Sequence, residues 1–446
     1  MSAADPPEPV SASDRGTAGP DPSWVRRTGH LLRPDPDRVL ARPFLPGQEL
    51  DSSGESRSAA VLQRVLELDD HEVDRELQVL VARFAHRHHD LPAIWDEHFT
   101  LVRDRLPDAG PLPEHRRRLV GACFTQEYAI EAAALFNPSM VPHPDQDGLP
   151  AGSTRFVMTL RGTGEGHVSS MELRTGTVDL AGVVRLSPPP VHARPPSKVE
   201  QIARRSWRLE FPPGSPFDER VLPPQGPAER HGIEDVRMVR FRDDDGTATY
   251  LGTYTAFDGR AITGQLLRTP DFTHITSGPL SGPGAQNKGL ALFPRKIAGR
   301  YVAVSRPDRE NNAITTSDDL LRWDHPAVVQ RPEHAWELVQ LGNCGPPIET
   351  EAGWLVLTHG VGPMRTYGIG ALLLDLDDPM RVVGRLSRPL LTAQGDERSG
   401  YVPNVVYSCG AMQHGHCLVL PYGCSDSTTR LALVDLPALL EKLAGP

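Results

Sequence analysis

The chain has 446 residues and a formal net charge of -10 at pH 7, which argues against a broad basic surface for nucleic acid. No apolar run approaches the roughly 20 residues of a membrane-spanning helix, and the N-terminal residues lack the charged start and apolar centre of a signal peptide. Five cysteines without a Cys-x-x-Cys pair argue against a disulfide framework or a zinc site, so we expect a cytoplasmic protein with no metal and no membrane partner.

The N-terminal part divides into a tail and a helical extension. Residues 1–24 are rich in Pro, Ser, Ala and Asp, which is typical of a disordered tail. Residues 25–135 are predicted to form a mostly helical extension, because apolar residues within 59–106 recur with helical spacing. Pro113 suits the first turn of a further helix, which is expected to run on to Leu135.

A histidine run and two proline-rich segments in the first 227 residues are assigned no function from the sequence. His86, His88 and His89 lie near an expected helix end, where a solvated basic terminus is favoured over a metal site. The proline-rich segments 186–197 and 211–227 are predicted to be long surface loops.

From residue 136 onward, one pattern of turn, strand and small or polar break recurs five times. The copies are 154–160, 249–254, 299–304, 353–358 and 416–421. Propeller blades repeat at about 40–50 residues, and the later four copies have blade-like spacing. The pattern predicts a mainly β, five-bladed propeller over residues 136–446. A sandwich of two sheets would explain the strands equally well, but not their repetition.

Polar residues follow the repeated strands and are candidates for one shared pocket. They are Arg161 to His167, Asp258, Arg306, His359, and Tyr422 to Asp426. Equivalent strand ends of a propeller converge near its central channel, so these side chains are expected to meet there.

Glu234 and Asp235 form an acidic pair at the start of a predicted strand. They follow Gly232 and Ile233, and Arg237 comes two residues after Asp235. A carboxyl group beside a cation keeps a low pKa unless it is desolvated. Local chemistry alone leaves two interpretations open, a turn followed by a salt-bridged strand and a catalytic acid.

Several motifs occur in an order that resembles glycoside hydrolase family 130, the β-mannoside phosphorylases and β-mannosidases. They are Phe136-Asn137-Pro138-Ser139, Gly232-Ile233-Glu234-Asp235-Val236-Arg237, Lys288 to Ile297, Ser305-Arg306-Pro307, Gly345 to Thr350, Thr358-His359-Gly360-Val361, Val402 to Val406, and Tyr422 to Asp426. The resemblance covers residue 136 to the C-terminus and implies a five-bladed propeller. The helical extension lies outside it.

The resemblance implies that Asp235 is the general acid. In the family's phosphorylases its proton is thought to reach the glycosidic oxygen through a sugar hydroxyl. Inorganic phosphate attacks the anomeric carbon from the opposite face, with inversion, and gives mannose 1-phosphate.

Phosphate as a nucleophile requires cations. Lys288 and Arg306 match two phosphate-binding positions of the family, and His359 and Tyr367 are further candidates for phosphate or sugar contacts. Where the family's phosphorylases carry a third basic residue, a lysine, this chain carries Glu349.

The sugar side of the site is represented as well. The resemblance assigns the mannosyl unit to Asn137, Ser139, Arg161 and Asp426. Glu165 and His167 add a hydrogen-bond acceptor and a switchable donor beside Arg161.

The predicted function is inverting cleavage of a β-mannosidic bond in a manno-oligosaccharide by phosphate, without a metal or organic cofactor. The first alternative is inverting hydrolysis, with Glu349 as the base that activates water. The second is a non-catalytic carbohydrate-binding propeller. A homo-oligomer is left open.

Overall fold

The computed structural model describes residues 21–45, 56–105 and 111–445, so most of the tail expected over 1–24 lies outside the described residues. Strands make up most of the regular structure, and the prediction of a mainly β chain is confirmed. No helix in these ranges is long and apolar enough to cross a membrane.

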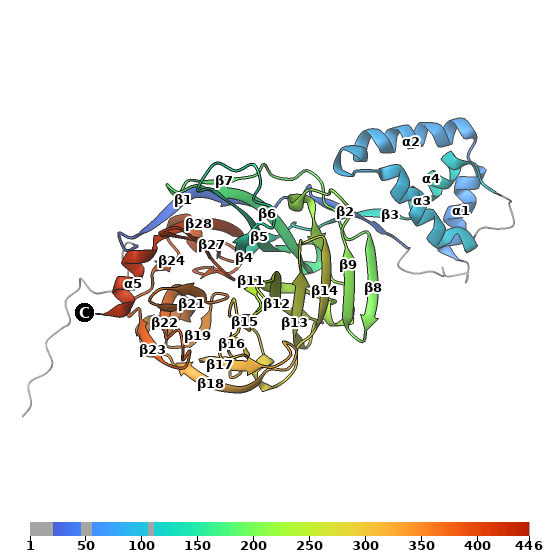
Figure 1. Cartoon of the computed structure of the whole chain (residues 1–446). Coiled ribbons are helices and arrows are strands. Elements are labelled where there is room, and N and C mark those ends of the chain that lie inside the picture. The colour runs from blue at the N-terminus through green and yellow to red at the C-terminus, as the bar shows by residue number, and fades with distance from the viewer. Residues whose placement is uncertain (1–20, 46–55, 106–110, 446) are drawn as a thin grey trace, which may run out of the picture.

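A group of helices stands to one side of the sheets in Figure 1. Within the described ranges it consists of α1 (Arg57–Glu67), α2 (Asp70–Phe84), α3 (Leu91–Val102) and α4 (Glu114–Cys123). Their apolar residues pack into one cluster that includes Leu62, Val73, Phe99 and Val120. Asp69 caps α2 by accepting from the Glu72 backbone N–H, while Glu72 accepts from the Asp69 N–H. The helices therefore have a small core of their own.

The expected helix up to Leu135 is wrong. Helix α4 ends at Cys123, and β3 (Thr125–Ala129) follows it and pairs with β2 (Val39–Pro43). Sequence spacing could not reveal this pair, because its two strands are separated by the whole helical group.

The interval 25–135 also contains a strand that belongs with the main sheets. β1 (Val25–Leu32) pairs antiparallel with β28 (Thr428–Asp435), close to the other end of the chain. The division at residue 136 thus assigns to the extension a strand that the structure places beside the C-terminal strands.

The sheets lie around a common centre (Figure 1). The first unit has β4 (Ala134–Pro142), β5 (Thr154–Thr163) and β6 (Ser169–Val178), with β7 (Val184–Leu186) and β10 (Val221–Leu222) beside β6. The second has β11 (Gly232–Arg242), β12 (Ala248–Phe257), β13 (Ile262–Thr269), β14 (His274–Pro279), β9 (Ser206–Glu210) and β8 (Lys198–Ala203). A parallel bridge between Gly232 and Ser169 joins these two units into one sheet.

The remaining units follow in chain order. The third has β15 (Ala291–Leu292), β16 (Tyr301–Ser305), β17 (Asn312–Ser317) and β18 (Asp324–Gln330). The fourth has β19 (Gln340–Asn343), β21 (Gly353–Val361), β22 (Tyr367–Leu374) and β23 (Val382–Arg385), with β20 (Ile348–Thr350) and β24 (Leu391–Thr392) beside them. The fifth has β25 (Val406–Tyr407), β27 (Cys417–Cys424), β28 and β1, with β26 (Met412–His414) on β27, and α5 (Leu436–Ala444) follows β28.

The repeated sequence pattern occupies the same place in every unit. Its copies are β5, β12, β16, β21 and β27, and each is the second strand of its unit. The repetition in the sequence therefore reflects a repeated position in the structure.

A buried network of charged side chains ties the N-terminal segment to β6. Arg38 donates to Glu172 at 2.7 Å and also pairs with Glu131, while Arg174 donates to Glu131 at 2.6 Å. Glu131 and Glu172 have no exposed side-chain surface, so each carboxylate depends on these arginines for compensation.

Candidate active site

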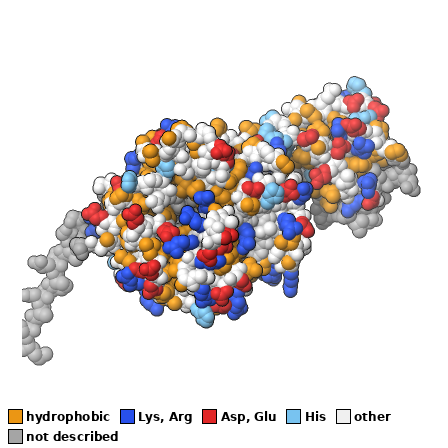
Figure 2. Space-filling model, in the orientation of Figure 1, with side chains coloured by type: hydrophobic (Ala, Val, Ile, Leu, Met, Phe, Trp, Pro, Cys, Tyr) orange, Lys and Arg blue, Asp and Glu red, His pale blue; other side chains and the backbone are white. Residues whose placement is uncertain are grey.

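A pocket of about 200 Å³ brings together most of the residues predicted for the site. Its lining includes the predicted residues Asn137, Arg161, Asp235, Lys288, Arg306, His359, Tyr367 and Asp426. Gln340, Arg365, Val405 and Tyr407 complete it. Figure 2 shows basic and acidic side chains gathered around a hollow in the middle of the sheet-bearing face.

Asn137 and Asp235 lie at irregularities in the first strands of two neighbouring units. The register of β4 shifts between Phe136 and Ser139, and that of β11 shifts between Glu234 and Arg237. Asn137 and Asp235 have left-handed backbone angles, with φ of 50° and 57°. Such bulges re-aim a side chain, and here Asn137 Nδ2 donates to Asp235 Oδ1 at 2.7 Å.

Glu234, the other member of the acidic pair, has a different environment. Its two carboxylate oxygens accept from separate cations: Arg161 Nη2 at 2.8 Å and Lys288 Nζ. It is buried and holds two pocket-lining cations in place. The adjacent Asp235 is left with one Asn137 hydrogen bond and an Arg161 Nη1 atom 3.5 Å away.

Arg237 supports the pocket from behind. It is almost completely buried, and it donates to the Asp235 carbonyl oxygen at 2.9 Å and to the Tyr407 hydroxyl at 2.7 Å. The first of these bonds holds the bulged backbone of Asp235, and the second fixes the Tyr407 ring that lines the pocket.

The two aspartates that line the pocket have pKa values shifted in opposite directions. Burial alone would raise the pKa of Asp235, but the charges of Arg161, Lys288 and Arg237 lower it below its ordinary value. Burial, and then the negative charge of Asp235, raises the pKa of Asp426 to about 6. Asp426 makes no hydrogen bond or ion pair to another described residue, so nothing nearby offsets its desolvation fully.

A third group of residues contains Arg306, His359 and Tyr367. Arg306 Nη1 lies 3.5 Å from His359 Nε2, and the rings of His359 and Tyr367 stack at 5.8 Å. Burial and the charges of Arg306 and Arg237 lower the pKa of His359 well below its ordinary value. His359 is therefore neutral at pH 7 and adds no charge to the pocket.

Three predicted sugar-binding residues do not line the pocket. Ser139 is fully buried, and its hydroxyl accepts from the Met238 backbone N–H at 3.0 Å, which joins β4 to β11. Glu165 and His167 are exposed in a short 3-10 turn between β5 and β6. The His167 ring instead lies 5.7 Å from that of Tyr401.

The structure contradicts the placement of Glu349 beside the phosphate or as a base. Glu349 lies in β20 and accepts from Arg295 at 2.7 and 3.0 Å, with 44% of its side chain exposed. Its neighbour Ile348 packs against a core cluster. Because successive strand residues point to opposite faces, Glu349 points outward.

Arg365 is the main site residue that the sequence interpretation did not include. It follows β21 in a short 3-10 turn (Pro363–Arg365), lines the pocket and makes no hydrogen bond or ion pair within the described chain. The rule that polar residues converge after the repeated strands could have found it, since His359 was selected from the same strand. Tyr407 and Gln340 lie on first strands, to which that rule does not apply.

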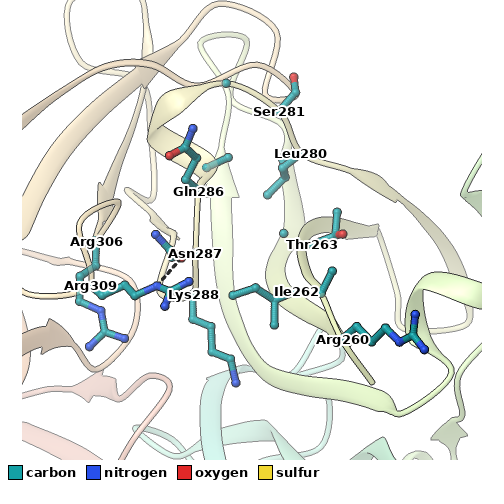
Figure 3. A pocket seen from close by; sticks show the side chains of 14 residues that line it. Arg260, Ile262, Thr263, Leu280, Ser281, Gln286, Asn287, Lys288, Arg306 and Arg309 are labelled. Atoms are coloured by element: carbon teal, nitrogen blue, oxygen red, sulfur yellow. Dashed lines mark hydrogen bonds between the residues drawn. The ribbon is translucent and has the colours of Figure 1, made fainter. Parts of the chain in front are cut away.

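A second cavity, of about 790 Å³, shares Lys288 and Arg306 with the first. Figure 3 shows Arg260, Arg309 and Gln286 among the side chains around it, together with Asn287, which accepts from Arg309 Nε at 2.8 Å. The two cavities therefore share a pair of cations.

Comparisons with known proteins agree with one family. A family model described as beta-1,4-mannooligosaccharide phosphorylase matches residues 215–444. A 1,2-beta-oligomannan phosphorylase of Thermoanaerobacter is 34% identical over 226 residues, which are 49% of this chain and 74% of that protein. A beta-1,2-mannobiose phosphorylase of Listeria innocua is 32% identical over 236 residues, which are 51% of this chain and 64% of that protein.

Solved structures show the same fold. A beta-1,2-mannobiose phosphorylase from Listeria innocua, solved with beta-1,2-mannobiose, superposes with a TM-score of 0.52 at 22% identity. The match covers 71% of this chain and 93% of that one.

Proposed function

The chain belongs to glycoside hydrolase family 130, and from this premise we propose that it cleaves a β-mannosidic bond of a manno-oligosaccharide with inorganic phosphate. The products are mannose 1-phosphate, formed with inversion, and the shortened acceptor. The observation that supports the proposal is the placement of Asp235 in a pocket lined by four cations, Arg161, Lys288, Arg306 and Arg365.

Phosphate fits this charge distribution. A dianion between Lys288 and Arg306 gains charge-assisted hydrogen bonds that a neutral water molecule cannot gain equally. Arg306 Nε is buried without a hydrogen-bond partner in the described structure, so this side chain has capacity for a ligand. Arg365 supplies the third cation, in the role that the resemblance gives to a lysine at the position of Glu349.

Phosphate binding would also prepare Asp235 to act as an acid. In the free pocket three cations lower the pKa of Asp235, so its carboxyl group is ionised at pH 7. A bound phosphate dianion offsets these charges and raises that pKa. Asp235 would then carry the proton that the leaving oxygen needs at the moment when both substrates are bound.

The mannosyl unit would lie between Asn137, Arg161 and Asp426, next to the acid. The remaining sugar would leave on the face of the anomeric carbon opposite the phosphate that Lys288 and Arg306 hold. The larger cavity of about 790 Å³, which shares these two cations, would then open on the phosphate side.

Hydrolysis is the weaker alternative, because Glu349 points outward and binds Arg295. A non-catalytic binding role is weaker still, since the pocket retains the acid and its cations.

We further propose that the five strand units are blades of one closed propeller, completed by β1. The mechanism uses only side chains and phosphate, so we expect no metal or organic cofactor in the pocket. The five cysteines all lie in the described ranges and are free, which supports the cytoplasm as the location.

The test is product analysis with the purified full chain. β-1,2- and β-1,4-mannobiose are each incubated with and without phosphate, and products are identified by mass spectrometry and NMR. We expect mannose 1-phosphate in the α configuration and little turnover without phosphate. Full-rate release of free mannose in phosphate-free buffer would overturn phosphorolysis, and no cleavage of any β-mannoside would overturn the whole proposal.

A further inference from the structure

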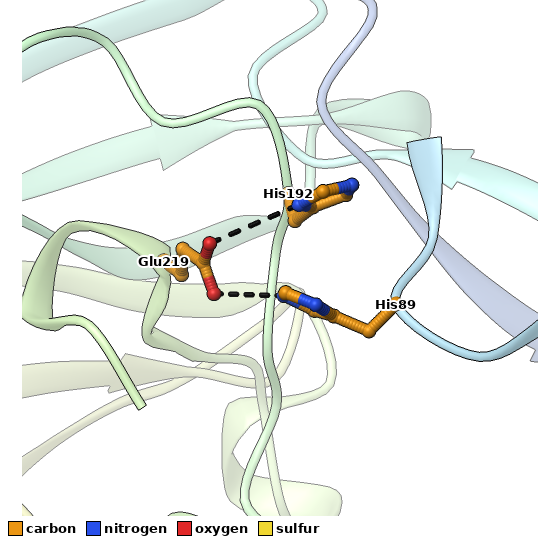
Figure 4. Close-up of side chains that lie close together, drawn as sticks. All are labelled: His89, His192 and Glu219. Carbon is orange, nitrogen blue, oxygen red and sulfur yellow. Dashed lines mark hydrogen bonds and ion pairs between the residues drawn. The ribbon is translucent and has the colours of Figure 1, made fainter. Parts of the chain in front are cut away.

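Three side chains from separate segments converge between the helical group and the sheets. They are His89, just before α3, His192 in the proline-rich loop before β8, and Glu219 at the end of a 3-10 turn (Phe217–Glu219) (Figure 4). Their ligand atoms all lie within 4.8 Å of one another. We propose that this cluster binds one Zn²⁺ ion that joins the helical group to the catalytic body.

The distances between the three side chains are compatible with their binding one shared metal ion. His89 Nε2 lies 2.8 Å from Glu219 Oε2, and His192 Nδ1 lies 3.8 Å from Glu219 Oε1. Zinc binds imidazole nitrogen and carboxylate oxygen at about 2.0–2.2 Å in a tetrahedron, which separates ligand atoms by a little over 3 Å. Small side-chain rotations convert the observed arrangement into this one and leave a fourth position for water.

The backbone holds two of the three ligands in a fixed relation. The Arg194 N–H donates to the Glu219 carbonyl oxygen at 2.7 Å, and the Val221 N–H donates to the Arg194 carbonyl oxygen at 3.0 Å. Asp218, next to Glu219, accepts from the Thr175 backbone N–H and hydroxyl at 2.7 and 2.6 Å. His192 and Glu219 therefore lie on segments anchored to each other and to β6.

The third ligand comes from an anchored segment as well. His88 Nε2 lies 2.9 Å from Glu127 Oε1 in β3, and Asp90 caps α3 by accepting from the Ala93 N–H at 3.0 Å. These contacts fix the backbone on both sides of His89.

Arg194 contributes in a supporting position. Its Nε donates to Glu219 Oε2 at 2.9 Å, the oxygen that also faces His89. Because Arg194 is hydrogen-bonded to Oε2, the other oxygen of Glu219, Oε1, would bind the ion together with His192. Metal-binding carboxylates are commonly held by such a second hydrogen bond.

The proposed site differs from the sequence-based expectation for this histidine run, which favoured a solvated basic helix terminus over a metal site. The proposed ligands come from three segments far apart in the chain, so the run itself could not reveal them. None of them lines the catalytic pocket, so the ion would act on structure and not on the reaction.

The first experiment measures zinc bound to the full chain. Protein is stripped with EDTA, dialysed, titrated with Zn²⁺ by calorimetry and assayed for zinc by mass spectrometry. We expect one equivalent, and no competition from excess Mg²⁺, which prefers oxygen ligands. Absence of a stoichiometric site, or displacement by Mg²⁺, would overturn the proposal.

Variants assign the site. His89→Ala and His192→Ala should each weaken Zn²⁺ binding at least about tenfold, because each removes one of three ligands. His86→Ala is the matched control, since His86 is exposed in the same segment but outside the cluster. Equal zinc affinity in all three variants would contradict the assignment.

Thermal unfolding provides an independent readout. At about a hundredfold excess over its Kd, Zn²⁺ should raise the melting midpoint of the wild type and of His86→Ala by at least about 2 °C. The cluster variants should show no rise, while their metal-free midpoints stay at the wild-type value. A zinc-dependent rise in the cluster variants would place the ion elsewhere.

Discussion

Asp235 and Asp426 line one pocket, yet the same surroundings lower the pKa of one and raise that of the other. The cations lie closest to Asp235, which also accepts from Asn137. Asp426 is desolvated and faces the charge of Asp235. Carboxyl groups with pKa values pushed apart are suited to different roles. We assign proton transfer to Asp235 and sugar binding to Asp426.

Asp235→Asn should lower kcat by about 10²–10⁴-fold, the usual contribution of a general acid. The amide oxygen can still accept from Asn137, and asparagine tolerates the left-handed backbone of this position. The melting midpoint and mannobiose affinity should therefore remain close to wild type. A near-normal kcat in the folded variant would show that Asp235 is not the general acid.

Asp426→Asn should stabilise the protein at neutral pH while reducing activity. A carboxyl group whose pKa is raised to about 6 on folding is ionised at a cost in the folded state. That cost is near zero below about pH 3, where the group is protonated in both states, and it grows as the pH rises through the ordinary pKa of 3.8 towards 6. The variant should exceed wild type by up to about 3 kcal/mol at pH 8, which is the free energy of raising the carboxyl pKa from 3.8 to about 6.

Urea unfolding at pH 4 and pH 8 measures this difference directly. The stability gain should be small at pH 4, where the unfolded carboxyl group has only begun to ionise, and largest at pH 8. A gain that is the same at both values would show that titration of Asp426 is not its source.

Arg365→Ala should raise the phosphate KM by at least about tenfold, because a charge-assisted contact contributes about 1.5–3 kcal/mol. Glu349→Gln is the matched comparison and should change that KM less than about twofold, since its ion pair with Arg295 is exposed. Initial rates at varied phosphate concentration test both. The opposite ranking would restore Glu349 to the site and remove Arg365.

The sequence identified eight of the pocket-lining residues, because motif order and strand ends mark where side chains converge. It failed for Glu349, since a motif gives a position in the chain but not the face of the strand to which the side chain points. It failed for Ser139 because a buried hydroxyl that joins two strands cannot be distinguished, in the sequence, from one that binds sugar.

At the scale of elements, irregularities in two strands direct Asn137 and Asp235 into the pocket. β4 and β11 each contain a bulge at the residue that faces the pocket, and Arg237 holds the second bulge from behind. Regular strands would send alternate side chains to the sheet faces. The bulges instead bring Asn137 and Asp235 within hydrogen-bond distance of each other.

The close packing of α3 and α4 predicts that a Gly→Ala substitution in α4 lowers stability, although such a substitution within a helix usually raises it. Gly121 in α4 lies against α3, where an added Cβ would come within 1.9 Å of the Trp95 carbonyl oxygen. Gly→Ala within a helix ordinarily stabilises by about 1 kcal/mol. Here overpacking should outweigh that gain, and Gly121→Ala should lose about 1–3 kcal/mol of stability.

Gly29→Ala is the control, because a Cβ at Gly29 would meet nothing within 4 Å. Both variants are compared by urea unfolding, followed by circular dichroism. A Gly121→Ala protein as stable as the wild type would show that the two helices separate at little cost.

The repeated sequence pattern correctly predicted the strands that it covers. All five copies of the pattern proved to be second strands. It failed for β1, β2 and β3, whose pairing partners are distant in sequence. Their hydrogen bonds depend on contacts that no short window contains, and the residues after Cys123 were therefore assigned to a helix.

For the whole molecule, the N-terminal segment is part of the main sheets. The Trp24 carbonyl oxygen accepts from the Asp435 N–H at 2.9 Å, and the Trp24 ring packs against a core cluster. Asp21 accepts from Arg27 Nε at 2.6 Å and from Gln394 at 3.0 Å. The expectation that residues up to 24 form a free tail is wrong for 21–24.

Deletion of residues 1–24 should therefore lower the melting midpoint relative to deletion of 1–20. The longer deletion removes the Trp24 packing and the Asp21 contacts next to β1, whereas the shorter one keeps them. Differential scanning fluorimetry of the two proteins measures the difference. Equal midpoints would show that these contacts add nothing to stability.

The pairing of β1 with β28 also sets the order in which the molecule can be assembled during its synthesis. β1 leaves the ribosome before every other strand described, and its partner β28 leaves last. Until then the backbone N–H and C=O groups of β1 have no strand to pair with and remain open to other chains. The unpaired edge of β1 is thus open to aggregation while all the strands between β1 and β28 are synthesised, and it is covered only once β28 has emerged.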